Sequence, residues 1–531
     1  MSAAESKVEK RSRVCGSKVK TGCITCKIRR VKCGEEKPHC LRCTSTGRKC
    51  DGYPSQAVTR THTQSLISLP RSDSSLHCLA GNATEARYLE FYFHRIGPKL
   101  SGFLDSDLWL RLVLQFAFAE PAIRHATMAI SYLYEKEIDD QCPGHPMLHS
   151  GTDESFFLQQ YNKAINNLVI RMNDKPGSLV ISLVTCMLFI CLECLRRKDC
   201  SAALFHLNSG VNILAGLRNK RQLGPPSASL LHTTSDRSSR GAGDNTMGFL
   251  EENLVPVFAR FSITAFLFGQ DASPLYLLES MILANPPSSF ASVQEARLSL
   301  VDLMNLSLMF VKLSTQKKHG NGMTQDDMVR FFQLKECMVR WLQAFENVEQ
   351  SNPSAQSERK AFALLRMLHT TTWIWLLSCI FPTEAPYDEY LNGFHQIISL
   401  AEVVMGFSEC QAVPKAQNDF SFEMEVVAPL YFTAVRCRDP LTRRKAIALL
   451  ARYPRREALW EAGRCVTVAK RIMALEESGL QGMVGRSWPP ERFRIHDAVF
   501  GANDSVFHVA FFSLPNGPGT PRYVWQEYLC T

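Results

Sequence analysis

Apolar residues recur at helical spacing along most of the chain from about residue 83 onward. Apolar positions three and four residues apart predict helices with one buried face, and unbroken apolar runs predict helices buried on all sides. The pattern predicts helices over residues 84–96, 104–118, 121–137, 156–172, 179–196, 200–217, 250–268, 293–314, 326–347, 358–380 and 387–405. Near the end, Phe493–Phe500 and Val506–Ser513 alternate apolar and polar residues, which predicts a short terminal β-hairpin. We therefore expect a mostly α-helical fold, with a large all-helical domain over residues 83–531.

The longest apolar run is LVISLVTCMLFICL, from Leu179 to Leu192. Fourteen residues are too few to span a bilayer, so the run predicts a helix buried in the core and no contact with a membrane. Cys191 lies in this run and Cys194 just after it, at helical i,i+3 spacing and without a matching second pair. Buried free thiols behave as small apolar groups, which favours a core role for both over a redox role.

Stretches of polar composition divide the chain into parts. Residues 1–20 form a basic arm that we expect to be disordered, and residues 53–82 have the Ser-, Thr- and Pro-rich composition of a linker. Residues 219–247 are rich in Pro, Ser and Gly and predict a mobile insertion between helices. The leucines of the linker make no sustained heptads, and Pro54 and Pro70 interrupt them. No zipper is therefore predicted, and a homodimer stays an open alternative.

Positive charge is concentrated at the start of the chain. Residues 1–60 hold 15 lysines and arginines and 5 acidic residues, whereas the whole chain has a net charge of +9. Electrostatic attraction to the phosphates of a nucleic acid is therefore confined to this region. The first residues, MSAAESKVEKRSR, lack the apolar segment of a secretion signal, and the basic clusters Lys7–Arg13 and Lys18–Lys32 are typical of nuclear import signals.

Six cysteines in residues 21–52 share the spacing C-x2-C-x6-C-x6-C-x2-C-x6-C, which repeats one pattern twice. Such a thiolate-rich pattern is typical of a structural zinc site. Six thiolates are too many for one tetrahedral ion and too few for two separate ions, so two zinc ions with two shared thiolates are the economical solution. A disulfide framework is the alternative, and it would require an oxidising compartment. The six are Cys23, Cys26, Cys33, Cys40, Cys43 and Cys50.

The segment CITCKIRRVKCGEEKPHCLRCTSTGRKC resembles the fungal binuclear zinc cluster family of transcription factors. All six ligand positions of the family match, and Pro38 lies where the family usually has a proline between the halves. The resemblance implies a nuclear, sequence-specific regulator of RNA polymerase II promoters that prefers CGG-type half-sites. It also implies the following metal ligands: Cys23 and Cys40 bridging both ions, Cys26 and Cys33 on one ion, and Cys43 and Cys50 on the other.

Basic residues alternate with apolar ones between the second and third cysteines, where the chain reads KIRRVK. Because Ile28 and Val31 are three residues apart, we expect both to face the metal cluster on a short helix while the basic side chains face outward. The second half-repeat is less basic in its helix, which predicts that the first half enters a DNA groove. Two zinc ions and six thiolates carry a formal charge of −2, so nearby cations also stabilise the cluster itself. The resemblance implies these contacts with double-stranded DNA: Arg29 and Arg30 with base edges, and Lys27 and Lys32 nearer phosphates.

Residues 429–460 are similar to the helical fungal-specific transcription-factor domain that accompanies the zinc cluster in many members of the family. Asp439 followed by Pro440 predicts a helix start, with an N-cap and a proline at the first helical position. The buried face of that helix is predicted to hold Ala446, Ile447 and Leu450. Eight basic residues lie within 436–456. Internal ion pairs and a solvated face explain them more simply than a second DNA contact.

Other chemistry is weakly indicated. Residues 419–425, DFSFEME, mix acidic and aromatic residues as activation segments do, but they lead into an apolar run, which favours a helix N-terminus. Cys142, His145 and His149 lie in a Pro- and Gly-containing loop, where solvated histidines are favoured over a second metal site. No Gly-rich phosphate loop, G-x-S-x-G elbow or H-E-x-x-H motif occurs, so no enzymatic activity is predicted.

The sequence therefore predicts a zinc-dependent, DNA-binding transcription regulator that is not an enzyme. The alternative is a zinc-cluster scaffold or co-repressor, which acts mainly through protein interactions of the helical domain. That domain either encloses a pocket for a metabolite or offers a surface to the transcription machinery or co-regulators. The sequence identifies no small-molecule effector, and we favour an interaction and regulatory domain.

Overall fold

The computed structural model describes residues 23–29, 31–37, 39–51, 82–101, 107–141, 154–174, 179–196, 200–219, 248–268, 283, 288–318, 322–351, 356–406, 420–453, 455–478, 480, 488–500, 508–517 and 520–529. The chain divides into two compact units, Met1–Pro70 and Arg71–Thr531, and each is described by itself. The predicted arm, nearly all of the predicted linker and nearly all of the predicted insertion lie outside the described residues.

The small unit holds two short helices, α1 (Ile24–Ile28) and α2 (Leu41–Thr44). Each follows a cysteine, Cys23 or Cys40, whose backbone is extended and which occupies the N-cap position. The two half-repeats of the sequence therefore fold alike, with the first cysteine of each C-x2-C pair before a helix and the second inside it.

The large unit consists mostly of helices. Its α-helices are α4 (Ala83–Phe91), α5 (Gly97–Leu100), α6 (Val113–Ala119), α7 (Pro121–Gln141), α8 (Ser155–Asp174), α9 (Leu179–Arg196), α10 (Cys200–Asn219), α12 (Val255–Leu267), α14 (Val293–Lys318), α15 (Gln325–Ser351), α16 (Gln356–Ser378), α17 (Leu391–Met405), α18 (Val427–Arg436), α19 (Pro440–Arg452) and α20 (Ala462–Ser478). Shorter π-helical or 3-10 segments are η1 (Tyr92–Ile96), η2 (Leu108–Leu112), η4 (Leu250–Leu254), η5 (Ala385–Tyr390) and η6 (Glu491–Phe493).

The helices predicted from hydrophobic periodicity are confirmed within a few residues at their described ends. Three of them, 84–96, 104–118 and 250–268, contain a π-helical turn, which a period of 3.6 residues does not reveal. The predicted start of α19 is also confirmed, because the Asp439 carboxylate accepts a hydrogen bond from the Thr442 backbone N–H at 2.8 Å. On the same helix Ala446, Ile447 and Leu450 are buried, as predicted.

Strands form two small sheets. The predicted terminal hairpin is confirmed as β4 (Ile495–Phe500) and β5 (His508–Ser513), which pair antiparallel. The prediction was incomplete, since β6 (Tyr523–Tyr528) adds a third antiparallel strand beside β5. The other sheet consists of two-residue strands in the order β1 (Phe420–Ser421), β2 (Arg456–Glu457) and β3 (Trp460–Glu461). The predicted helix start after DFSFEME is confirmed as α18, but the segment itself holds β1, and its Glu423 and Glu425 are buried.

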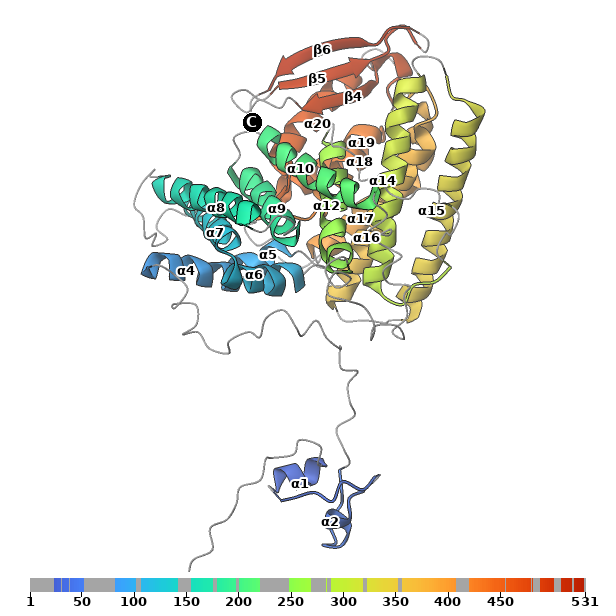
Figure 1. Ribbon diagram of the computed structural model, residues 1–531. Coiled ribbons are helices and arrows are strands. Elements are labelled where there is room, and N and C mark those ends of the chain that lie inside the picture. The colour runs from blue at the N-terminus through green and yellow to red at the C-terminus, as the bar shows by residue number, and fades with distance from the viewer. Residues whose placement is uncertain are drawn as a thin grey trace, which may run out of the picture. The chain divides into compact units, whose positions relative to one another are not determined.

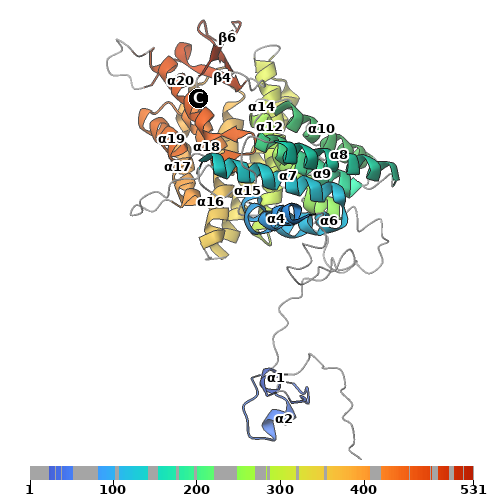
Figure 2. The same ribbon diagram turned by 90° about the vertical axis from the view of Figure 1, so that its left-hand side faces the viewer.

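The large unit has two hydrophobic cores. One lies mainly among α4–α15, and the other mainly among α17–α20 with β4 and β5. Helix α16 contributes to both, because Phe362 and Leu365 lie in the first and Met367 and Ile374 in the second. Figures 1 and 2 show α4–α9 on one side of this unit, and α17–α19 with the sheet β4–β6 on another.

Three described helices are long and apolar enough to cross a membrane: α9, residues Cys200–Leu217 of α10, and α14. Of the most apolar 18-residue stretch, 72% is buried inside the unit in α9 and in α14, but 33% in α10. Cys191 and Cys194 of α9 are buried in the first core, so the predicted core role of both thiols is confirmed.

The basic segment between Arg436 and Arg456 is paired with acidic residues of the same unit. At least seven of its eight cations form ion pairs: Arg436 with Glu384, Arg438 with Glu384 and Glu476, Arg443 with Glu476, Arg444 with Glu477, Lys445 with Glu402, Arg455 with Glu425, and Arg456 with Glu137. The predicted internal ion pairs are confirmed, and a second DNA contact is disfavoured because these cations already have acidic partners.

Glu476 is the centre of the buried part of this network. Its carboxylate accepts hydrogen bonds from Arg438 at 3.0 Å, from Arg443 at 2.5 Å and from the Ile495 backbone N–H at 2.8 Å. It therefore joins the start of α19, helix α20 and the start of β4. Burial alone would raise the pKa of Glu476, but the two guanidinium groups lower it below its ordinary value.

We predict that Glu476→Gln destabilises the large unit by about 3–5 kcal/mol, because it leaves Arg443 buried without a charged partner and Arg438 with Glu384 alone. The matched control is the neighbouring Glu477→Gln, which removes an exposed pair with Arg444 and should cost about 1 kcal/mol or less. Urea unfolding followed by tryptophan fluorescence measures both, since all seven tryptophans lie in the large unit. Equal losses in the two variants would contradict the central role of Glu476.

A second prediction concerns His369, which stacks between Trp341 and Trp373 and bonds through Nε2 to the Met338 carbonyl at 3.0 Å. Burial lowers the pKa of His369 to about 4. Between its ordinary pKa of about 6.5 and pH 4, the unfolded chain takes up a proton that the folded chain does not. This group should therefore lower the free energy of unfolding by about 3 kcal/mol as the pH falls from 7 to 4. His369→Phe should reduce this fall in the free energy of unfolding between pH 7 and pH 4, as measured by urea unfolding at several pH values. An unchanged pH dependence in the variant would show that His369 does not cause it.

Candidate metal centre and nucleic-acid surface

A cluster of sulfur atoms forms the interior of the small unit. Five of the six predicted cysteine ligands are at most 4% exposed, and Cys33 packs against them half-buried. The Sγ atoms of Cys23 and Cys40 are 3.6 Å apart, and those of Cys26 and Cys43 are 3.7 Å apart. The structure therefore brings together all six residues that the sequence singled out, without a disulfide among them.

Local backbone structure places these thiols. The Cys23 Sγ accepts a hydrogen bond from the Cys26 backbone N–H at 3.4 Å, which caps α1 and turns both side chains inward. The Cys33 Sγ accepts from the backbone N–H groups of Cys23 at 3.3 Å and Glu35 at 3.4 Å. Backbone donors aimed at sulfur stabilise a thiolate, as metal ligands require.

The four innermost thiols have the spacing of a tetrahedral zinc site. Zn–S bonds of about 2.3 Å place the sulfurs about 3.8 Å apart. The separations that link Cys23 and Cys26 to Cys40 and Cys43 are 3.6–3.9 Å, and all four sulfurs lie within 4.8 Å of one another. Cys33 and Cys50 complete the sulfur cluster outside this group of four. The donor set thus fits zinc, and six thiols supply the ligands of two ions that share two of them.

Because the cysteine thiols are buried, their deprotonation depends on a bound cation. It raises the pKa of the Cys23 thiol well above its ordinary value and that of Cys43 to about 12. Without a cation these groups stay protonated and neutral, whereas a bound metal ion deprotonates a coordinating thiol. Zinc binding and the thiolate form of the cluster are therefore coupled.

The apolar residues of the module face solvent, which corrects one prediction. Ile28 is 75% exposed and Val31 is 37% exposed, although both were expected to face the cluster. The reason is the helical period: Ile28 follows the inward-facing Cys26 by two residues and so points about 200° away from it. The spacing of Ile28 from Cys26, and not its spacing from Val31, therefore decides which way it faces.

Two side-chain contacts stabilise the module, and neither was predicted from the sequence. Thr25 Oγ1 donates a hydrogen bond to the Asp51 carboxylate at 2.8 Å and accepts one from the Asp51 backbone N–H at 2.9 Å. This pair ties α1 to the chain beyond the last cysteine. The Glu36 carboxylate accepts from the Leu41 backbone N–H at 2.9 Å and so caps α2. The sequence signals are a hydroxyl and a carboxylate next to cysteines for the first contact and a carboxylate a few residues before α2 for the second, and both are too common to be informative.

The predicted DNA contacts lie on and after α1. Lys27 and Lys32 are exposed, whereas Arg29 is half-buried and ends the helix. Arg29 follows Cys26 by three residues and so lies closer to the cluster side than Lys27 does. Arg30 lies outside the described residues, as do Pro38 and the loop residues Cys142, His145 and His149. Among the described residues of this surface, Lys27 and Lys32 therefore present positively charged side chains to solvent.

Comparison with known proteins shows which domain family the N-terminal module matches. Residues 21–59 match the fungal Zn(2)-Cys(6) binuclear cluster domain. The chain is 33% identical over 277 residues to the aspercryptin biosynthesis cluster-specific transcription regulator atnN of Emericella nidulans. The aligned region covers 45% of this chain and 42% of that protein. It is 28% identical over 215 residues to the transcription regulator lscL of Purpureocillium lilacinum, covering 38% of this chain and 50% of that protein.

A shorter match falls on the transcriptional regulatory protein moc3 of Schizosaccharomyces pombe, with 47% identity over 60 residues, or 11% of each chain. The matches therefore span half or less of the length of these relatives. No solved structure matches the chain.

We predict two zinc ions per chain, since a binuclear cluster uses all six thiols. Cys40→Ser should lose both ions, because Cys40 is fully buried and its sulfur contacts those of Cys23 and Cys26. Cys50→Ser, outside the group of four, should retain at least one ion. Metal analysis of the purified full-length chain measures this, with Cys200→Ser as the control outside the module. One ion per wild-type chain, or greater loss in Cys50→Ser than in Cys40→Ser, would contradict this arrangement.

Proposed function

We propose that this chain, whose N-terminal module is a fungal Zn(2)-Cys(6) binuclear cluster domain, is a zinc-dependent transcription regulator that binds specific DNA sequences in the nucleus. The observation that carries the proposal is the buried cluster of six thiols with basic residues directly attached to its first helix. A closed structural metal site offers no open coordination position for catalysis, which agrees with a regulator that is not an enzyme.

We further propose that all six cysteines hold the two ions, with Cys23 and Cys40 as the shared ligands. The sulfur separations support this, because the 3.6 Å between Cys23 and Cys40 is the shortest of the four that link the two half-repeats. A cluster of net negative charge and the adjacent basic side chains stabilise each other. The metal therefore fixes both the shape and the electrostatics of the surface that meets DNA.

The DNA contacts follow from the placement of the basic residues. Lys27 and Lys32 are exposed and suit contacts with phosphates, which strengthen binding to every sequence. Arg29 and Arg30 are assigned to base edges, where a guanidinium group pairs with guanine O6 and N7. Guanine recognition agrees with a preference for CGG-type half-sites at RNA polymerase II promoters.

The large helical unit is assigned to regulation. Its basic C-terminal segment is committed to internal ion pairs, so DNA affinity rests on the small module. Residues 83–531 would then serve contacts with co-regulators or the transcription machinery, and residues 53–82 would tether the two units. A zinc-cluster scaffold or co-repressor with weak DNA contact is the competing function.

Chromatin mapping in the source fungus, paired with expression profiling after deletion, separates the two functions. A regulator should occupy discrete promoters that share a motif, and the genes beside them should change expression on deletion. Arg29→Ala together with Arg30→Ala should remove that occupancy. Occupancy without a shared motif, retained in this double variant, would favour the scaffold.

In vitro, Arg29→Ala or Arg30→Ala should cost about 1–3 kcal/mol on the specific site and relax the preference at one base pair. Lys27→Ala or Lys32→Ala should weaken binding to specific and random DNA alike, and each should reduce the salt slope by about one. Arg48→Ala, an exposed cation in the second half-repeat, is the matched control with little effect on base preference. Equal losses on both DNAs in all four variants would show that the base contacts are misassigned.

A further inference from the structure

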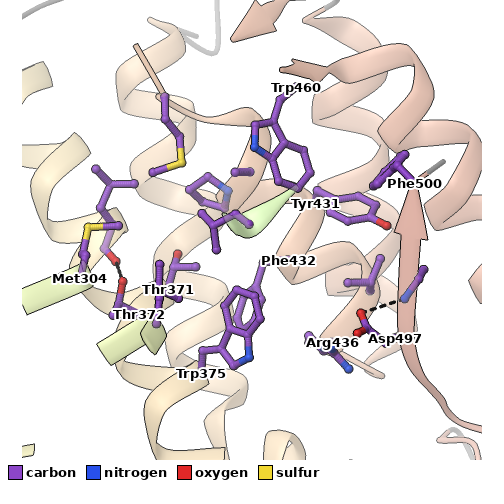
Figure 3. A pocket seen from close by; sticks show the side chains of 18 of the residues that line it. Met304, Thr371, Thr372, Trp375, Tyr431, Phe432, Arg436, Trp460, Asp497 and Phe500 are labelled. Atoms are coloured by element: carbon purple, nitrogen blue, oxygen red, sulfur yellow. Dashed lines mark hydrogen bonds between the residues drawn. The ribbon is translucent and has the colours of Figure 1, made fainter. Parts of the chain in front are cut away.

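The large unit contains a cavity of about 80 Å³ where its second core meets helices α14 and α16. One buried water needs roughly 10–15 Å³ of such space, so this cavity exceeds the space that a single water fills. Its walls come from α14, α16, α18, α20 and β4, together with Leu267, Met424 and Trp460. Figure 3 shows side chains converging on it from helices on one side and from strand β4 on the other.

Five aromatic rings lie in the mainly apolar walls, in two groups. Tyr431 lies 5.5 Å from Trp460 and 5.7 Å from Phe500 between ring centroids, which forms one group. Trp375 and Phe432, 5.4 Å apart, form the other. Figure 3 shows these groups at different sides of the space. Ring faces and edges of this kind favour contact with another apolar or aromatic group.

The charged groups in the lining do not favour a charged ligand. Arg436 and Asp497 are the lining residues that carry charge. The Arg436 guanidinium donates to the Glu384 carboxylate at 2.6 Å and to the His496 carbonyl at 2.7 Å, so its charge is already neutralised. Asp497 accepts a hydrogen bond from the Ala498 backbone N–H at 2.9 Å, and its charge is compensated by the nearby Arg436: burial lowers the pKa of Arg436, but Glu384 and Asp497 raise it above its ordinary value. A neutral molecule therefore fits this site better than an anion or a cation.

Two lining side chains carry polar groups that remain unsatisfied. Within the described part of the chain, Tyr431 Oη and Trp460 Nε1 are buried without a hydrogen-bond partner. Leaving a buried donor unpaired is costly, so each such group in a folded protein calls for an explanation. The indole N–H can only donate, and burial raises the pKa of Tyr431 well above its ordinary value, so its hydroxyl stays protonated. Both groups therefore lack an acceptor.

We propose that this cavity is a binding site for a compact, neutral, largely apolar molecule with a carbonyl or ether oxygen. The aromatic walls contact its hydrocarbon part, and Tyr431 or Trp460 donates a hydrogen bond to its oxygen. This site is independent of the DNA-binding function proposed above, since it lies wholly in the large unit.

A neighbouring cavity of about 40 Å³ extends the site. The two share Met304, Leu368 and Met424 in their walls. Methionine side chains rearrange easily because they are unbranched, so a molecule longer than the first cavity can displace them into the second. The site therefore accepts elongated members of the same chemical class.

Acetophenone and α-methylstyrene test this proposal, because they have nearly the same shape and differ in a carbonyl oxygen against a methylene group. The full-length protein is labelled with 5-fluorotryptophan, and the signals of Trp375 and Trp460 are assigned by Trp→Phe substitution. Acetophenone should shift both fluorine signals saturably and should bind about tenfold more tightly than α-methylstyrene, which corresponds to one hydrogen bond. No saturable shift of either signal would overturn the proposal and identify the cavity as a packing void.

Four variants complete the test. Tyr431→Phe or Trp460→Phe, whichever removes the donor, should reduce the preference for acetophenone to less than about threefold while α-methylstyrene still binds. Thr371→Phe should fill the cavity and abolish binding of both molecules, with circular dichroism as the check on folding. Tyr134→Phe, a buried tyrosine on α7 that lines neither cavity, should change nothing. Unchanged binding in a folded Thr371→Phe would place the ligand elsewhere, and an unchanged preference in both Tyr431→Phe and Trp460→Phe would rule out the hydrogen bond.

Discussion

Metal–thiolate bonding is the interaction on which the DNA-binding module depends. The module has no hydrocarbon core: Ile24, Ile28, Val31 and Leu41 are 37–75% exposed, while the cysteines fill its interior. Hydrophobic burial therefore cannot hold α1 and α2 together, and zinc coordination must supply most of the folding free energy, about 10 kcal/mol or more per structural ion. Since Lys27 and Arg29 are placed by α1, the surface that meets DNA exists only in the metal-bound state.

The large unit is stabilised in a different way. It buries two hydrophobic cores around α16, and a network of arginine–glutamate pairs centred on Glu476 joins α19, α20 and β4. Breaking such a buried network is costly even when the network itself adds little stability, so it fixes the arrangement of these elements. The aromatic cavity lies against them, which gives the site walls of defined geometry.

Periodicity, capping and ligand spacing made much of this structure predictable. The helices, the N-cap at Asp439 and the buried thiols of α9 follow from local patterns, and so does the clustering of the six cysteines. Other features depend on long-range contacts that no local pattern encodes. The two-residue strands β1 to β3 are too short to show alternation, and β6 has exposed aromatic residues that resemble a terminal segment. The orientation of Ile28 failed for a local reason, because the position of Cys26 decides which face of α1 is buried.

The central claim is that zinc creates a sequence-specific DNA-binding surface at the start of this chain. Selection of bound fragments from a random DNA library by the full-length protein tests it directly, in parallel with zinc-loaded protein, chelator-treated protein and chelator-treated protein to which zinc is restored. The account predicts one enriched motif containing CGG in the zinc-loaded and restored samples and no motif after chelation. An identical motif after complete removal of the metal, or no motif from zinc-loaded protein at any salt concentration, would contradict it.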